Sequence, residues 1–175
     1  MVPAFAGALE IQGVKVPPSV PVNGQSLPLN GAGLRTFSLL MVPIKIYVAA
    51  FYAPGPLRSE ASVLSSPGPM EFSFTFLRAV DASDVARAWS SQFSASVSFT
   101  YAGYEKDRDA FVGMFGALRQ GGVQSVRFVG TDTLIFDQGT QKGTIAGRDF
   151  QRAFLSMWFG SNPVSPDLKA ALLGQ

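Results

Sequence analysis

The chain contains no cysteine and no histidine. These two absences exclude thiol nucleophiles, disulfides, zinc sites, the Ser-His-Asp triad and histidine acid-base chemistry together. Any chemistry must therefore rely on arginine, lysine, tyrosine, carboxylates or hydroxyls. We expect neither a metal nor a cofactor.

Charge is also scarce, because charged residues make up only 15% of the chain and hydrophobic residues 47%, with 15 phenylalanines. This composition predicts an aromatic core and excludes disorder over most of the sequence. The 14 Lys and Arg exceed the 12 Asp and Glu by only two and form no run of like charge, so nucleic-acid binding gains no support.

A long apolar run is missing too. The best candidate, residues 39–54, is interrupted by Pro43 and Lys45, so we expect no membrane span. At 175 residues the chain has the length of one domain, which can bury most of its surface around a single core. The sequence leaves the oligomeric state open.

The N-terminus carries a small-x-small pattern, Ala4-Phe5-Ala6, of the kind that signal peptidase cuts. We therefore interpret residues 1–26 as an N-terminal segment with a signal-peptide remnant and edge strands, and residues 27–175 as the main domain. This predicts a periplasmic or secreted protein. The alternative is an ordinary N-terminus on a cytoplasmic protein.

Hydrophobic periodicity and turn residues predict the order of the elements. Strands are expected in "ALEIQG", "LPLNGAG", "LRTFSLLM", "KIYVAAFYAP", "PMEFSFTFLRAV", "VQSVRFVG", "DTLIFDQG" and "QKGTIAG". Helices are expected in "SEASVLSS", "DASDVARAWSSQFSA", "EKDRDAFVGMFGALRQGG", "RDFQRAFLSMWFG" and "SPDLKAALLG". The two long strands should connect at Val42 and Pro43, and the third helix should end at Gly121-Gly122.

Because the strands connect mostly by hairpins and the helices cluster separately, the fold class is α+β, with an antiparallel sheet and helices on one face. The GxG pair in "NGAGLR" precedes a strand and not a helix, which argues against a dinucleotide-binding loop. Lys169, inside the last helix, is interpreted as solvated.

Four segments, "GAGLRTFSLLMVPIKIYVAAFYAP", "FTFLRAVDASDVARAW", "KGTIAGRDFQRAFLSMWFG" and "NPVSPDLKAALLG", resemble the chalcone isomerase-like family, in particular its bacterial branch. They occur in the family's order over roughly residues 27 to 174. The resemblance implies an open-faced β-sandwich with a ligand cleft between the sheet and the helices.

In plant chalcone isomerases an arginine at the start of the long hairpin positions the chalcone, and Arg35 matches it. The same register places Tyr47 where those enzymes use a threonine, and Met157 and Trp158 where a hydroxyl residue is usual. The family's helical tyrosine and asparagine have no clear match; Tyr101 or Tyr104 approximates the tyrosine. As an isomerase, the chain would use Arg35 and Tyr47 catalytically.

The departures from the enzymes resemble the fatty-acid-binding members of the fold, in which an arginine and a tyrosine hold a carboxylate. A guanidinium grips a carboxylate through two parallel hydrogen bonds, and a phenol adds a third. We therefore predict a small amphiphilic ligand, fatty-acid or flavonoid-like, and no turnover. The predicted ligand-binding residues are Arg35, Phe37, Tyr47, Tyr104, Phe111, Phe115, Met157 and Trp158.

Two other functions remain open. One is a weak or vestigial isomerase that converts chalcone to flavanone, and the other is a partner-binding domain with an unused cleft. The clamp itself depends on strand register. A hairpin centred near Met41 pairs residues whose numbers sum to about 82, which sets Arg35 opposite Tyr47 on one face of the sheet.

Overall fold

The computed structural model describes residues 8–175, so the small-x-small pattern at Ala4-Phe5-Ala6 lies outside it. The strands are β1 (Leu9–Ile11), β2 (Val14–Val16), β3 (Ser19–Val22), β4 (Gln25–Leu39), β5 (Val42–Tyr52), β6 (Met70–Phe76), β7 (Val123–Val129), β8 (Asp132–Asp137) and β9 (Thr140–Ala146). The helices are α1 (Glu60–Ser65), α2 (Ala82–Ser96), α3 (Tyr104–Gly113), α4 (Arg148–Phe159) and α5 (Pro166–Leu172).

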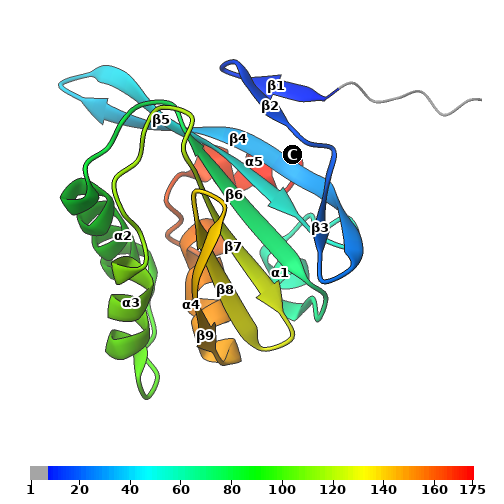
Figure 1. The fold of residues 1–175 in the computed structure, drawn as a ribbon. Coiled ribbons are helices and arrows are strands. Elements are labelled where there is room, and N and C mark those ends of the chain that lie inside the picture. Colours follow the sequence, from blue (N-terminus) through cyan, green and yellow to red (C-terminus); the bar gives the residue numbers. More distant parts are fainter. Residues whose placement is uncertain (1–7) are drawn as a thin grey trace, which may run out of the picture.

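Strands β3 to β9 form one seven-stranded sheet in chain order, and every pair of neighbours is antiparallel. Strands β1 and β2 form a separate hairpin. Helices α4 and α5 lie against one face of the curled sheet, with α2 and α3 beside them (Figure 1). The predicted α+β class, with helices on one face, is confirmed.

Alternating side chains divide the sheet into two faces. Phe72, Phe74 and Phe76 of β6 are buried on the helix side, in a core that also takes the apolar sides of α2 and α4. On the other face, Val48, Ala50 and Tyr52 of β5 form a smaller core with Val16 and Val22 of the N-terminal strands. The N-terminal segment therefore covers β5 on the face that the helices leave open.

The turn between β4 and β5 is not where the sequence indicated. It lies at Leu40 and Met41, whose φ angles of 49° and 65° match a turn of type I′, and not at Val42 and Pro43. Pro43 sits inside β5 opposite Ser38, where β6 does not yet accompany β5. A strand paired on one side only tolerates a proline, because the missing N–H faces no partner.

Helix α3 is shorter than predicted, since it ends at Gly113 and not at the double glycine. Leu118 exchanges two backbone hydrogen bonds with Val80, and the Gly121 N–H donates to the Phe76 carbonyl. These extended contacts to the end of β6 compete with helix continuation. Phe115 and Leu118 are still buried, so the apolar pattern marked the core although it misassigned the helix.

Within residues 8–175, no helix has both the length and the hydropathy that a membrane crossing requires.

Candidate functional site

Arg35 and Tyr47 face each other across β4 and β5, as the register argument predicted. The register is not a regular one, however. From Thr36 to the turn the paired numbers sum to 81, and a bulge at Ile46 adds the residue that brings Arg35 opposite Tyr47. The carbonyl of Ile46 accepts a hydrogen bond from the Leu77 N–H, at 2.9 Å, which holds the bulge in place.

Tyr47 lies among aromatic rings on the helix side of the sheet. Its ring centroid is 5.4 Å from that of Phe74, 5.3 Å from Phe76 and 6.5 Å from Trp158. Burial raises the pKa of Tyr47 well above the ordinary value of a phenol, and the charge and hydrogen bond of Arg35 offset part of that rise. The hydroxyl therefore stays protonated at neutral pH and can donate a hydrogen bond.

Arg35 is partly buried and has no acidic partner in the described part of the chain. Its guanidinium donates to the backbone carbonyl of the neighbouring Thr36. Between Glu10 and Glu60 the sequence contains no Asp or Glu at all. The guanidinium can therefore accept an anion from outside the protein without breaking an ion pair.

Trp158, whose ring packs against that of Tyr47, supplies a third donor. Its side chain is 1% exposed, and its indole N–H has no hydrogen-bond acceptor among residues 8–175. A buried donor without an acceptor costs about 1–3 kcal/mol, so an acceptor at this position would be favourable. Arg35, Tyr47 and Trp158 together form what we call the donor cluster.

The other predicted ligand-binding residues lie at different distances from this cluster. Phe111 and Phe115 are buried and reach it through Trp89, whose ring lies 5.0 Å and 5.6 Å from theirs and 6.3 Å from Trp158. Met157 is buried beside Trp158 on α4. Two predicted residues stand apart: Phe37 is 52% exposed on the projecting hairpin, and Tyr104 packs on Tyr101 and Phe93 at the start of α3.

The space between the sheet and the helices is filled by these rings. Two surface pockets lie elsewhere, one lined by Arg127, Asp132 and Thr144 on the open side of the sheet and one by Met70, Gln151 and Leu155 near α1 and α4. Nowhere in residues 8–175 do three acidic side chains gather into a metal-binding group.

Helix α5 forms the wall of the site next to Arg35. Gly31, Gly33 and Arg35 alternate along β4 on the helix side. A Cβ atom at Gly31 would lie 2.1 Å from the Ala171 carbonyl oxygen, and one at Gly33 would lie 2.7 Å from the Ala171 Cβ. The two glycines of the GxG pair thus allow α5 to pack directly on β4, a structural role that the sequence pattern did not indicate.

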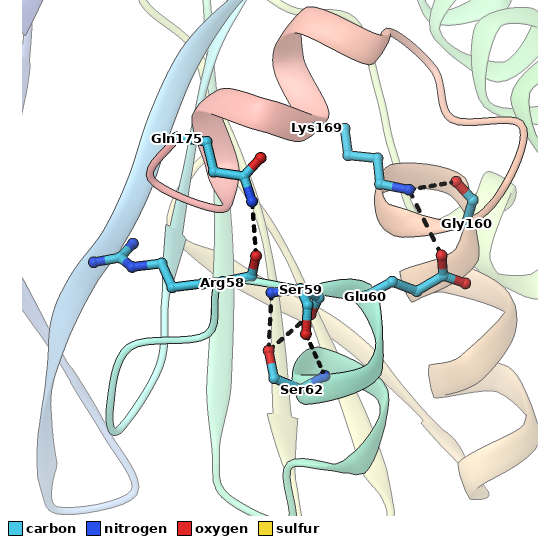
Figure 2. Close-up of polar contacts among 7 residues, drawn as sticks. All are labelled: Arg58, Ser59, Glu60, Ser62, Gly160, Lys169 and Gln175. Atoms are coloured by element: carbon cyan, nitrogen blue, oxygen red, sulfur yellow. Dashed lines mark hydrogen bonds and ion pairs between the residues drawn. The ribbon is translucent and has the colours of Figure 1, made fainter.

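Polar contacts fix both ends of this wall. Asn30 forms a second bulge, this one on β4, and its side chain donates to the Leu57 and Leu172 carbonyls, while Arg58 donates to the Leu173 carbonyl. Lys169 donates to the Gly160 carbonyl at 2.9 Å and reaches Glu60 at 3.6 Å (Figure 2). The interpretation of Lys169 as solvated was wrong, because its ammonium ties α5 to the end of α4 and the start of α1.

Sequence reasoning missed a buried polar group under α2. Gln124 and Asp137 are opposite each other on β7 and β8, and the Trp89 indole donates to the Gln124 side-chain oxygen at 3.2 Å. Asp137 also accepts from the Gly116 N–H at 3.1 Å. Alternation along each strand could have indicated that these two residues are buried. Gln124 shares its face of the sheet with Val126 and Phe128, and Asp137 shares its face with Ile135.

The comparisons with known proteins agree with this architecture. A fatty-acid binding protein of Arabidopsis thaliana superposes with a TM-score of 0.74 at 16% sequence identity, and the match covers 92% of each chain. At that identity the likeness establishes the fold. A search of the curated proteins finds no match. The family model described as chalcone isomerase-like matches residues 8–174, so the chain belongs to the chalcone isomerase-like family.

Proposed function

We propose that the protein binds a fatty acid, or a similar amphiphilic carboxylate or phenolate, with its head group at the donor cluster. The observation that carries the proposal is the pairing of Arg35 with Tyr47 in a stretch of sequence that has no carboxylate. Three donors of different geometry, with no internal anion to satisfy them, favour an external anion.

The surroundings of the donor cluster suit an acyl chain. Phe74, Phe76 and Trp158 surround Tyr47, and Trp89 continues the apolar surface toward Phe111. Such a chain would lie between the sheet and the α2–α3 pair. The fold-level likeness to a fatty-acid binding protein supports this choice of ligand by analogy.

No general base is present at the cluster, which favours binding without turnover. Burial raises the pKa of Tyr47, so its phenol stays neutral. A protonated phenol can orient or donate to a ligand, whereas general-base catalysis needs a group whose pKa lies near the working pH.

Calorimetric titration of the delipidated protein with a long-chain fatty acid and with its methyl ester tests the proposal. The ester keeps the chain and removes the charge, so the acid should bind at least about tenfold more tightly if a charge-assisted contact of about 1.5–3 kcal/mol is lost. Equal affinity for acid and ester would contradict the carboxylate site.

The alternative function, a weak chalcone isomerase, is supported by the same Arg35, since its charge can stabilise a developing oxyanion. With 2′-hydroxychalcone near neutral pH we expect no rate above spontaneous cyclisation, or a slow and weakly stereoselective one. Rapid formation of one flavanone enantiomer that is lost in Arg35→Ala would reverse the order of the two functions. The periplasmic or secreted location remains a prediction of the N-terminal sequence.

A further inference from the structure

The hairpin of β4 and β5 projects beyond the body of the protein and carries an exposed apolar tip (Figure 1). Leu40 and Met41 in the turn are 91% and 96% exposed. Phe37, Leu39 and Val42 next to them are 52%, 52% and 60% exposed. These five residues, which we call the hairpin tip, hold most of the large exposed hydrophobic side chains of residues 8–175.

The backbone conformation of the hairpin tip is also unusual for these residue types. A type I′ turn places both central residues at positive φ, where Asn and Gly are preferred and a large side chain is unfavourable. Leucine and methionine occupy these positions here, at φ 49° and 65°. Neither side chain gains compensating burial within the protein, so the tip has the residues that a contact outside the protein would use.

The two charged residues of the long hairpin behind the tip, Arg35 on β4 and Lys45 on β5, are both positive. Lys45 pairs with Thr36 one step behind the tip, and Arg35 follows on the neighbouring rung. Lys15 lies on the adjacent β1–β2 hairpin, which is tied to the tip region by a 2.7 Å hydrogen bond from the Lys45 ammonium to the Gln12 side chain. Glu10 lies opposite Lys15 on that small hairpin, whereas the sequence between Glu10 and Glu60 has no acidic residue to oppose Arg35 and Lys45.

We propose that the hairpin tip docks the protein on the surface of an anionic lipid bilayer. The apolar side chains would enter the boundary between head groups and acyl chains, and Lys45 and Arg35 would remain at the depth of the lipid phosphates. An apolar end backed by cations matches the layered polarity of this interface. The docking does not depend on the proposed ligand, although it would bring the donor cluster close to membrane fatty acids.

A second copy of the chain fits the tip less well. Two tips that meet would bring their lysines and arginines together without any carboxylate, which is repulsive. A two-stranded tip is also narrow, whereas a stable protein interface buries about 800 Å² on each partner. The charge pattern therefore favours lipid.

Vesicle flotation tests the proposal, with the delipidated protein and vesicles of phosphatidylcholine alone or mixed with phosphatidylglycerol. The protein should float with the mixed vesicles and much less with phosphatidylcholine alone. The double variant Leu40→Asn, Met41→Gly removes the apolar side chains and installs preferred turn residues, so it should fold well and bind about tenfold or more weakly. Lys45→Gln should weaken binding about fivefold.

Leu64→Asn is the matched control, because Leu64 on α1 is also an exposed leucine and lies far from the tip. It should bind vesicles as the wild type does. In a second measurement, Met41→Trp should give a blue-shifted emission on addition of mixed vesicles, since Trp89 and Trp158 are already buried.

Three outcomes would overturn the proposal. The first is that the wild type fails to float with either kind of vesicle. The second is that the double variant floats as well as the wild type. The third is that the double variant abolishes a dimer seen by ultracentrifugation while neither protein binds vesicles. None of these results bears on the acid-over-ester preference, so the two proposals fail separately.

Discussion

At the scale of single residues, the donor cluster combines three side chains whose surroundings differ. Arg35 contacts a backbone carbonyl, Tyr47 packs among rings, and the Trp158 N–H has no acceptor in the described part of the chain. Because neither Arg35 nor Tyr47 holds a buried partner charge, Arg35→Ala and Tyr47→Phe should cost the fold little, whereas Trp158 is a core residue whose removal would destabilise it. The cluster is thus open to separate tests of binding and stability.

The replacement Arg35→Ala should weaken binding of a long-chain fatty acid by about 2–5 kcal/mol, the range for removing one partner of a buried charged pair. Tyr47→Phe keeps the ring and should cost about 0.5–1.5 kcal/mol, the net value of one hydrogen bond. Both are measured by calorimetric titration of the delipidated protein.

The control is Arg87→Ala, which removes the same charge from an exposed position on α2, where Arg87 pairs with Asp84. It should leave the affinity unchanged. If Arg35→Ala bound the acid as tightly as this control, Arg35 would be a surface residue and not part of a binding site.

At the scale of elements, the close approach of α5 to β4 positions Arg35. The helix starts at the Ser165 N-cap with Pro166 in its first turn, and its last carbonyls are held by Asn30 and Arg58. Gly31 and Gly33 remove the side chains that would otherwise separate the two elements. Strand β4 can therefore pack directly against α5 and also hold Arg35 beside that helix.

Adding one methyl group at this contact should be destabilising. In Gly31→Ala the new Cβ would meet the Ala171 and Leu172 carbonyl oxygens at 2.1 Å and 2.6 Å, so strand or helix must move. We expect a loss of about 1–3 kcal/mol, typical of overpacking, measured by urea unfolding. Weakened ligand binding should accompany it, because α5 borders the site.

Gly113→Ala is the matched control, since nothing lies within 4 Å of a Cβ added there at the end of α3. Alanine has the better helix propensity, so this variant should be as stable as the wild type or up to about 1 kcal/mol more stable. Equal effects of the two replacements would mean that α5 adapts without cost.

At the scale of the whole molecule, the missing histidines and the buried tyrosines shape the response to pH. No side chain has an unperturbed pKa in the region near 6.5 that histidine occupies. The chain has four tyrosines, and burial raises the pKa of each of them, Tyr47, Tyr52, Tyr101 and Tyr104. The phenols therefore stabilise the fold in their protonated form.

Stability should accordingly fall as the pH rises through about 10, the ordinary tyrosine pKa. Above that value the unfolded state releases phenol protons that the native state keeps, so unfolding becomes more favourable. Tyr52→Phe loses the hydrogen bond to the Pro17 carbonyl and should be less stable at neutral pH. Its alkaline loss should nevertheless be shallower than that of the wild type.

Urea unfolding at a series of pH values from about 7 to about 11 checks this, with the difference between wild type and variant as the readout, because lysines titrate in the same range. Parallel curves for the two proteins would mean that Tyr52 titrates normally in the fold.

The sequence by itself determined the elements whose signals are local. Alternation of Phe72, Phe74 and Phe76 predicted β6 and its buried face, and the Ser165-Pro166 start predicted α5. Family motifs and strand parity also predicted that Arg35 and Tyr47 share a face, and the pairing is confirmed. Two of the predicted ligand residues, Phe37 and Tyr104, carried no comparable positional constraint and lie away from the cluster.

The tertiary structure decided what depends on distant contacts. The turn lies at Leu40 and Met41, so the paired residue numbers near it sum to 81 and not to the expected 82. The bulge at Ile46, held by Leu77, adds one residue and restores the sum of 82 that pairs Arg35 with Tyr47. Helix α3 ends early because Leu118 pairs with Val80, and Lys169 is engaged because Gly160 and Glu60 fold next to it. Local patterns report propensity and burial, whereas bulges, helix ends and polar partners are set by groups far away in the chain, which no short window of sequence contains.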